Sequence, residues 1–141
     1  MSDPTQNPIP PQAPPPAYIP PAPHASSGLS DNVAAALAYV TIIPAIIFLV
    51  LEPYNKIPLV RFHSFQSIAF CVASVVVQIA LAIFESFLHF IPLSWMLFGA
   101  LNMLVGLAIF IAWVVVILKA SKGEWYKLPV IGDFAEKQAR G

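Results

Sequence analysis

Long apolar runs separated by short polar stretches dominate the sequence from about residue 30 onward. The first run, residues 33–51, reads VAAALAYVTIIPAIIFLVL and carries no charged side chain. A helix of this length covers about 28 Å, close to the hydrocarbon thickness of a bilayer at about 30 Å. Pro44 lies within the run, and we expect it to kink the helix. The pattern therefore predicts a first transmembrane helix at residues 33–51.

Two more runs predict two more spans, at residues 64–87 and 93–118, with Pro92 in the short connection between them. Helices that pack around the core of a soluble protein need a polar face toward water, and neither run has one that is wide enough. We therefore predict an all-α integral membrane protein whose three transmembrane helices form a small bundle. This membrane domain covers residues 30–141, and residues 119–141 are its interfacial C-terminal segment.

The segment before this domain has a different composition. Residues 1–29 hold most of the fifteen prolines, as in PIPPQAPPPAYIPPAP. Proline fixes φ and lacks the amide donor, so we predict a disordered, proline-rich tail. A spacer is the simpler interpretation, and a ligand for a partner with an aromatic groove is the alternative.

Composition and charge support the membrane assignment. Hydrophobic residues make up 58% of the chain and charged residues only 10%, whereas a soluble domain carries about 25% charged residues. Seven basic residues balance seven acidic ones, which argues against a nucleic-acid partner held by charge. We expect the lipid bilayer as a partner, with a second copy of the chain or other membrane proteins.

The basic residues predict an orientation in a prokaryotic cell membrane. With three spans, the connection between the first two spans and the C-terminal segment lie on the same side. These two segments hold all seven Lys and Arg residues. The positive-inside rule then places the C-terminus in the cytoplasm and the N-terminus outside.

A polar stripe follows the second span. Residues three and four apart share one face of a helix, and from His63 this face continues through Ser67, Cys71, Ser74 and Gln78. In lipid such side chains turn toward other helices or a wet cavity. Helix packing through hydrogen bonds is one interpretation. A lining for something that binds or passes is the other.

We take seven residues as candidates for an interface or a polar groove. Arg61 and His63 should lie at the cytoplasmic interface, and Asn102 of the third span should seek an amide or hydroxyl partner such as Gln78 or Ser74. We expect this cluster to tie the first connection to the bundle. The candidates are Arg61, His63, Gln66, Ser67, Ser74, Gln78 and Asn102.

The sequence offers little for catalysis. His63 and His89 are about 39 Å apart along one helix, so they cannot share a metal ion within a monomer. Ser67 and His63 lack an acid and an oxyanion site. Cys71 is the only cysteine. We predict that the protein is not an enzyme and has no cofactor or metal.

Three stretches together suggest a family: AAALAYV in the first span, LVRFHSFQS entering the second, and KGEWYKLPVIGDFAEK after the third. They resemble a set of small prokaryotic membrane proteins similar to the chloroplast inner-envelope protein-import component called Tic-twenty. Arg61, His63, Gln66 and Ser67 carry the most specific part of this resemblance. It implies a helical membrane domain and, for the plastid relatives, a part in polypeptide translocation. Those relatives have four spans, so a channel does not follow for this chain.

Two functions remain open at this point. The first is a structural or assembly subunit of a membrane complex, which we favour. The second is a transport-related subunit, for protein import or for a small solute or ion, with a polar groove along the second span. A scaffold should keep Ser74, Gln78 and Asn102 dry, whereas a transport subunit should let water reach them.

Overall fold

The computed structural model describes residues 28–141, and all of its regular elements are helices. The order is α1 (Asp31–Leu37), α2 (Ile42–Val50), the short 3-10 helix η1 (Tyr54–Lys56), α3 (Pro58–Leu88), α4 (Ser94–Ser121) and α5 (Ile131–Arg140). The predicted proline-rich tail lies outside the described residues. The prediction of an all-helical fold is confirmed for these residues.

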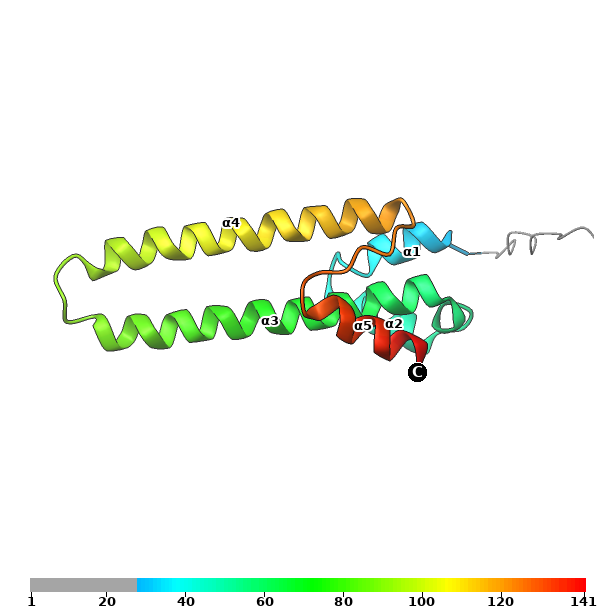
Figure 1. The fold of residues 1–141 in the computed structure, drawn as a ribbon, viewed down its shortest axis with the longest axis horizontal. Coiled ribbons are helices and arrows are strands. Elements are labelled where there is room, and N and C mark those ends of the chain that lie inside the picture. The colour runs from blue at the N-terminus through cyan, green and yellow to red at the C-terminus, as the bar shows by residue number, and fades with distance from the viewer. Residues whose placement is uncertain (1–27) are drawn as a thin grey trace, which may run out of the picture.

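Two helices, α3 and α4, are long and apolar enough to cross a membrane. They form an antiparallel hairpin that extends well beyond the remaining helices (Figure 1). The predicted third span, residues 93–118, corresponds closely to α4. The predicted second span began at residue 64, but α3 begins at Pro58, because proline at the first helical position loses no hydrogen bond. The RFHSFQS stretch therefore lies inside the helix.

The prediction of three spans is not confirmed, because residues 33–51 do not form one helix. After α1 the chain makes a tight turn, in which the amides of Tyr39 and Val40 bond to carbonyls three residues earlier. Thr41 is then extended, with φ −150° and ψ 172°, and α2 begins at the next residue. Pro44 cannot donate to the carbonyl four residues before it, and its ring clashes there. Within the first turn of a new helix, this missing donor costs no hydrogen bond.

The chain also reverses direction at this turn, so that α1 and α2 form a helical hairpin. The backbone amide of Leu29, before α1, donates to the hydroxyl of Tyr54 in η1 at 2.9 Å. Both ends of the α1–α2 hairpin thus lie together, at the end of the molecule that also holds the C-terminus (Figure 1). If residues 33–51 crossed the membrane as one helix, Leu29 and Tyr54 would lie on opposite sides of it.

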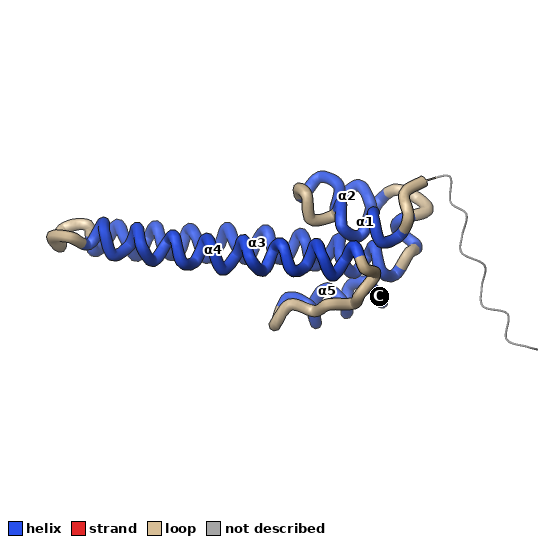
Figure 2. Tube along the Cα trace, turned by 90° about the horizontal axis from the view of Figure 1, so that it is seen from above, coloured by secondary structure: helices blue, strands red, loops and turns tan. Residues whose placement is uncertain are grey.

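The buried core is concentrated at this same end. Figure 2 shows α1 and α2 on one side of the α3–α4 hairpin and α5 on the other. Small residues let the helices approach closely: Ala34, Ala38 and Ala45 are fully buried in one cluster, and Ala35 and Ala120 in another. A third cluster joins α5 to α3. The rest of the hairpin exposes apolar side chains, as expected of helices that face lipid.

Candidate functional site

A buried polar cluster lies where α3 passes between the α1–α2 turn and the segment after α4. His63 and Gln66 are fully buried, and Ser67 is 6% exposed. Side chains three and four apart on α3 point to the same side, so this face meets Tyr39 from the turn and the backbone of residues 124–128. Three segments that are distant in sequence thus meet around these side chains.

The hydrogen bonds of the cluster allow one consistent assignment of donors and acceptors. His63 Nε2 lies 3.1 Å from the carbonyl oxygen of Glu124. A carbonyl only accepts, so Nε2 carries the proton and Nδ1 is the acceptor. The hydroxyl of Tyr39 therefore donates to His63 Nδ1, at 3.1 Å. That hydroxyl in turn accepts a hydrogen bond from Gln66 Nε2 at 2.9 Å.

Gln66 fastens the segment after α4 directly. Its Nε2 also donates to the carbonyl oxygen of Tyr126 at 3.1 Å, and its Oε1 accepts from the amide of Leu128 at 3.4 Å. One side chain thus satisfies two backbone groups that have no helical or sheet partner. Because unpaired backbone groups are costly in an apolar surrounding, Gln66 fixes the path of this segment.

Two other side chains hold the α1–α2 turn. The hydroxyl of Ser67 donates to the carbonyl oxygen of Ala38 at 2.5 Å. The indole Nε1 of Trp113, on α4, donates to the carbonyl oxygen of Tyr39 at 2.8 Å. These two carbonyls are left without helical partners where α1 ends. The turn is therefore attached to both α3 and α4.

Arg61 lies on a different side of α3 and is half-buried. Its Nη2 donates to the carbonyl oxygen of Gln138 on α5 at 3.2 Å. Below it, Phe62 packs with Ala135 and Ala139, and its ring stacks on Trp125 with centroids 4.8 Å apart. The structure thus separates Arg61 from His63, Gln66 and Ser67, which we had grouped with it.

The remaining candidates do not join the cluster. Ser74 donates to the carbonyl oxygen of Phe70 on its own helix at 2.8 Å. Gln78 is exposed and Asn102 half-buried. Within residues 28–141, Asn102 makes no hydrogen bond with Gln78 or Ser74, the partners that we expected.

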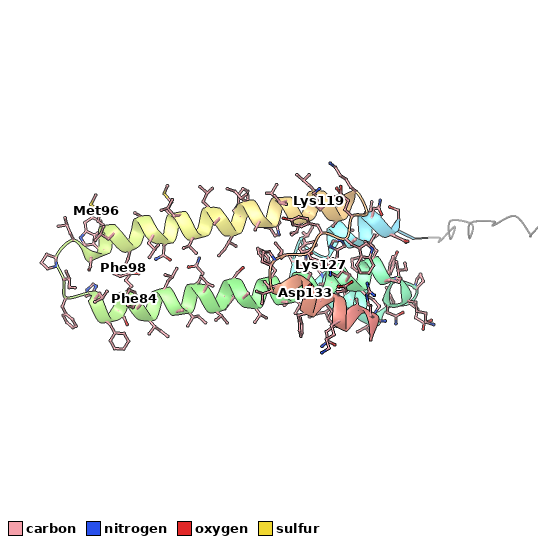
Figure 3. The ribbon with its side chains drawn as sticks, viewed as in Figure 1. Phe84, Met96, Phe98, Lys119, Lys127 and Asp133 are labelled. Carbon is pink, nitrogen blue, oxygen red and sulfur yellow. The ribbon has the colours of Figure 1, made fainter. Side chains whose placement is uncertain are left out.

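The spacing of the hairpin explains this difference. Figure 3 shows Phe84 and Phe98 facing one another between α3 and α4 near the connection, with ring centroids 5.7 Å apart in an edge-to-face arrangement. At the opposite end the α1–α2 turn bridges the two helices, through Ser67 on α3 and Trp113 on α4. These bulky groups keep α3 and α4 too far apart for the amides and hydroxyls between them to meet.

Apolar grooves occupy the space between these two contacts. A cavity of about 390 Å³ lies beside the α1–α2 turn. A second, of about 400 Å³, continues along the hairpin and shares Ser74, Val75, Gly106 and Ile109 with the first. Cys71 lines the first cavity and Gln78 the second. The polar stripe of the sequence therefore does face the space between α3 and α4, but most of the surface there is apolar.

Sequence reasoning missed Tyr39 and Trp113 as members of the site. Tyr39 had a signal, since it is the single phenol of the first run and lies five residues before Pro44. Trp113 had none, because an indole within an apolar span is common. In the part of the chain that the structure describes, no three His, Cys, Asp or Glu side chains lie together as metal ligands would.

The comparisons with known proteins agree on a family. Residues 30–135 match the magnetosome magnetite crystal formation protein family, MamF/MmsF. A UPF0132 membrane protein of Methanocaldococcus jannaschii is 45% identical over 82% of this chain and 94% of its own length. A UPF0132 membrane protein of Archaeoglobus fulgidus is 41% identical over 80% of this chain and 99% of its own length. No solved structure matches the chain significantly.

These findings correct the resemblance drawn from the sequence. The stretches AAALAYV, LVRFHSFQS and most of KGEWYKLPVIGDFAEK fall within the matched residues, but the family they belong to is not the Tic-twenty-like one. The relatives are membrane proteins, as the composition had indicated. This chain belongs to the MamF/MmsF family of membrane proteins, whose archaeal members are the UPF0132 proteins.

Proposed function

We propose that this chain is a small membrane scaffold, an assembly subunit that associates with copies of itself or with other membrane helices through the α3–α4 hairpin. The observation that carries the proposal is the apolar groove along the inside of that hairpin. Gly106 lines both of its cavities, and a side-chain carbon added there would meet no atom within 4 Å. Small residues beside open space are typical of positions where another helix packs.

The buried polar groups support the same proposal. His63, Gln66 and Ser67 hydrogen-bond to Tyr39 or to backbone groups of the same chain. A polar cluster used in this way stabilises the fold at the end of the molecule that holds α5 and the Lys and Arg residues, which we call the basic end. It leaves the rest of the hairpin exposed for contacts with other proteins. The family description refers to magnetite crystal formation; the scaffold proposal rests on the groove and takes no role in mineral formation from that description.

A substitution at Gly106 tests the proposal. We expect Gly106→Leu to fit within the monomer, because the space beside it is open, and to block the approach of a partner helix. Gly99→Leu is the matched control, since Gly99 also has open space beside it and does not line either cavity. Chemical cross-linking or mass measurement in lipid nanodiscs reads the number of copies in each assembly.

Wild-type and Gly99→Leu proteins should form the same oligomer, and Gly106→Leu should be mainly monomeric with an unchanged helix content. If Gly106→Leu assembles like the wild type, the groove is not the contact. If the wild type is a monomer at every protein density and copurifies with no membrane protein, the scaffold proposal is wrong.

One observation favours transport as a second candidate. The cavity beside the α1–α2 turn holds Ser67, Cys71 and Ser74. In a transport-related subunit this cavity would hold water and connect to one face of the membrane. Thiol labelling at Cys71 separates the two functions, as set out in the Discussion.

A further inference from the structure

The contact between α3 and α5 has a regular antiparallel register. Arg61 on α3 bonds to Gln138 on α5. Four residues further along α3 is Phe65, four residues back along α5 is Phe134, and these two aromatic side chains line one groove together. Arg61 thus lies one helical turn closer to the basic end of the molecule than this pair of phenylalanines.

The groove that begins at these two phenylalanines is almost purely apolar. It has a volume of about 500 Å³ and follows the outer face of α3 from Phe65 to Val76. This stretch of helix is about 16 Å long, which is about half of the hydrocarbon thickness and hence the reach of one acyl chain in one leaflet. Phe134 forms its side wall and is 52% exposed. The other lining residues are Ile68, Ala69, Val72 and Ala73.

Two cations lie at the end of this groove that is nearer the basic end of the molecule. Arg61 precedes Phe65 by one helical turn on α3, and Lys137 follows Phe134 by one turn on α5. Among residues 28–141, neither has a carboxylate within 4 Å, whereas Lys56, Lys119, Lys127 and Arg140 each do. Arg61 uses one donor on the Gln138 carbonyl, and a guanidinium has four more, in a planar fork that matches phosphate oxygens.

We propose that the outer face of α3 and α5 binds one anionic phospholipid, with an acyl chain in the groove beside Phe134 and the phosphate on Arg61 and Lys137. Hydrocarbon alone would fill the groove without using the cations, and a free phosphate would use the cations without the groove. An anionic lipid fits both halves of the surface. The inference rests on the membrane location of the chain and not on its role in assembly.

Native mass spectrometry of the full chain in detergent tests the proposal, with dioleoylphosphatidylglycerol against dioleoylphosphatidylcholine. We expect the wild type to retain phosphatidylglycerol preferentially. Each cation near an anionic lipid contributes about fivefold in affinity, so Arg61→Gln and Lys137→Gln should each lower the preference by about that factor. Arg61→Lys keeps the charge and should retain most of the preference.

Lys122→Gln is the matched control, because Lys122 also has no carboxylate partner among the described residues and lies at the end of α4, away from the groove. It should leave the preference unchanged. Ala69→Trp fills the groove and should release phosphatidylglycerol although both cations remain. Excess glycerol phosphate should not displace the bound lipid.

Three results would overturn the proposal. The first is equal retention of the two lipids by the wild type. The second is an equal loss in Lys122→Gln, which would indicate diffuse attraction to the whole basic end. The third is full retention in Ala69→Trp, which would place the lipid elsewhere. If Arg61→Gln also detaches α5, as reported by Trp125 fluorescence, Lys137→Gln decides the outcome, because the Lys137 side chain makes no ion pair within residues 28–141.

Discussion

The Nε2 atom of His63 on α3 lies 3.1 Å from the carbonyl oxygen of Glu124, sixty-one positions later in the chain. Gln66 binds the same segment one turn further on, through Tyr126 and Leu128. Residues 124–128 have no helix or strand of their own, so these two side chains, together with the stacking of Phe62 on Trp125, hold the segment in position. The start of α5 follows three residues later, so these bonds also direct the chain toward α5, which packs on α3 through Phe62, Ala135 and Ala139.

Replacing Gln66 by leucine should therefore loosen the segment after α4. The substitution keeps the size of the side chain but leaves the Tyr126 carbonyl, the Leu128 amide and the Tyr39 hydroxyl without this partner. Each buried polar group that loses its partner costs about 1–3 kcal/mol. We expect faster amide exchange in residues 124–130 and a lower free energy of unfolding in mixed detergent micelles.

Gln78→Leu is the control for this change. It is the same substitution on the same helix, but Gln78 is exposed and makes no hydrogen bond within the described residues. It should leave both measurements unchanged. Equal effects of the two substitutions would mean that Gln66 does not hold the segment in place.

The attachment of α5 should weaken in acid. Lys127, before the helix, pairs with Glu136 and lies 3.5 Å from Asp133 (Figure 3). The hydrogen bond from Lys127, together with Arg140, lowers the pKa of Glu136 below its ordinary value of 4.5. The same bond to Glu136, together with Asp133, raises the pKa of Lys127 above its ordinary value of 10.5.

The sign follows from these two directions. A lowered carboxyl pKa contributes stability above about pH 4.5 that is lost as the pH falls through the value in the folded state. A raised lysine pKa contributes stability that is lost only above about pH 10.5. Trp125 fluorescence should thus be constant from about pH 6 to pH 9 and change in acid. Because these groups are on the surface the change should be small, and Glu136→Gln should remove the acid-dependent part.

The two ends of the described chain should face the same side of the membrane. The α1–α2 hairpin starts and returns at the end of the molecule where α5 lies, and two spans return the chain to the side it started from. The basic residues gather at that end, which the positive-inside rule assigns to the cytoplasm. Epitope tags at residue 28 and after Gly141 should both be protected in sealed right-side-out vesicles and both become accessible on permeabilisation. A tag at residue 28 that is accessible without permeabilisation would restore the three-span arrangement.

Cys71 reports whether the groove is wet. It is the only cysteine, it is exposed in the single chain, and it lines the cavity beside the α1–α2 turn. For an assembled scaffold we expect no labelling by a membrane-impermeant thiol reagent from either side, and full labelling after denaturation. Gly106→Leu provides the comparison. Dissociating the assembly would place lipid rather than water beside Cys71, so we expect no labelling of this variant from either side. Rapid labelling of the native protein from one side would favour the transport function.

The parts of the fold that were predictable are those fixed by long uninterrupted patterns. Residues 93–118 carry no charged side chain and are followed by Lys119, so α4 appears almost at its predicted bounds. The face that carries His63, Ser67 and Ser74 follows from helical spacing alone. His63 and Ser67 turn inward as polar groups in lipid should, and their partners Tyr39, Ala38 and Glu124 come from segments whose positions only the folded chain defines.

The reversal after Leu37 was not predictable from composition. An apolar run of this length is compatible either with crossing the bilayer or with entering and returning, and Pro44 indicates a break without giving its angle. What decides the angle lies elsewhere: Ser67 and Trp113 accommodate the carbonyls that the break leaves open. The missing pair of Asn102 with Gln78 has a similar origin, because the distance between α3 and α4 is set by aromatic side chains at the two ends of the hairpin.

The hydrogen bond from Trp113 to Tyr39 spans seventy-four positions, and this constrains the order of events during synthesis. When the α1–α2 segment leaves the ribosome, the donor that its turn requires has not yet been made. The turn can take its final form in the bilayer only after α4 is inserted, so the first helices to be translated are among the last to settle. A nascent chain halted before Trp113 should keep the turn near the surface of the membrane, where water supplies the missing donor.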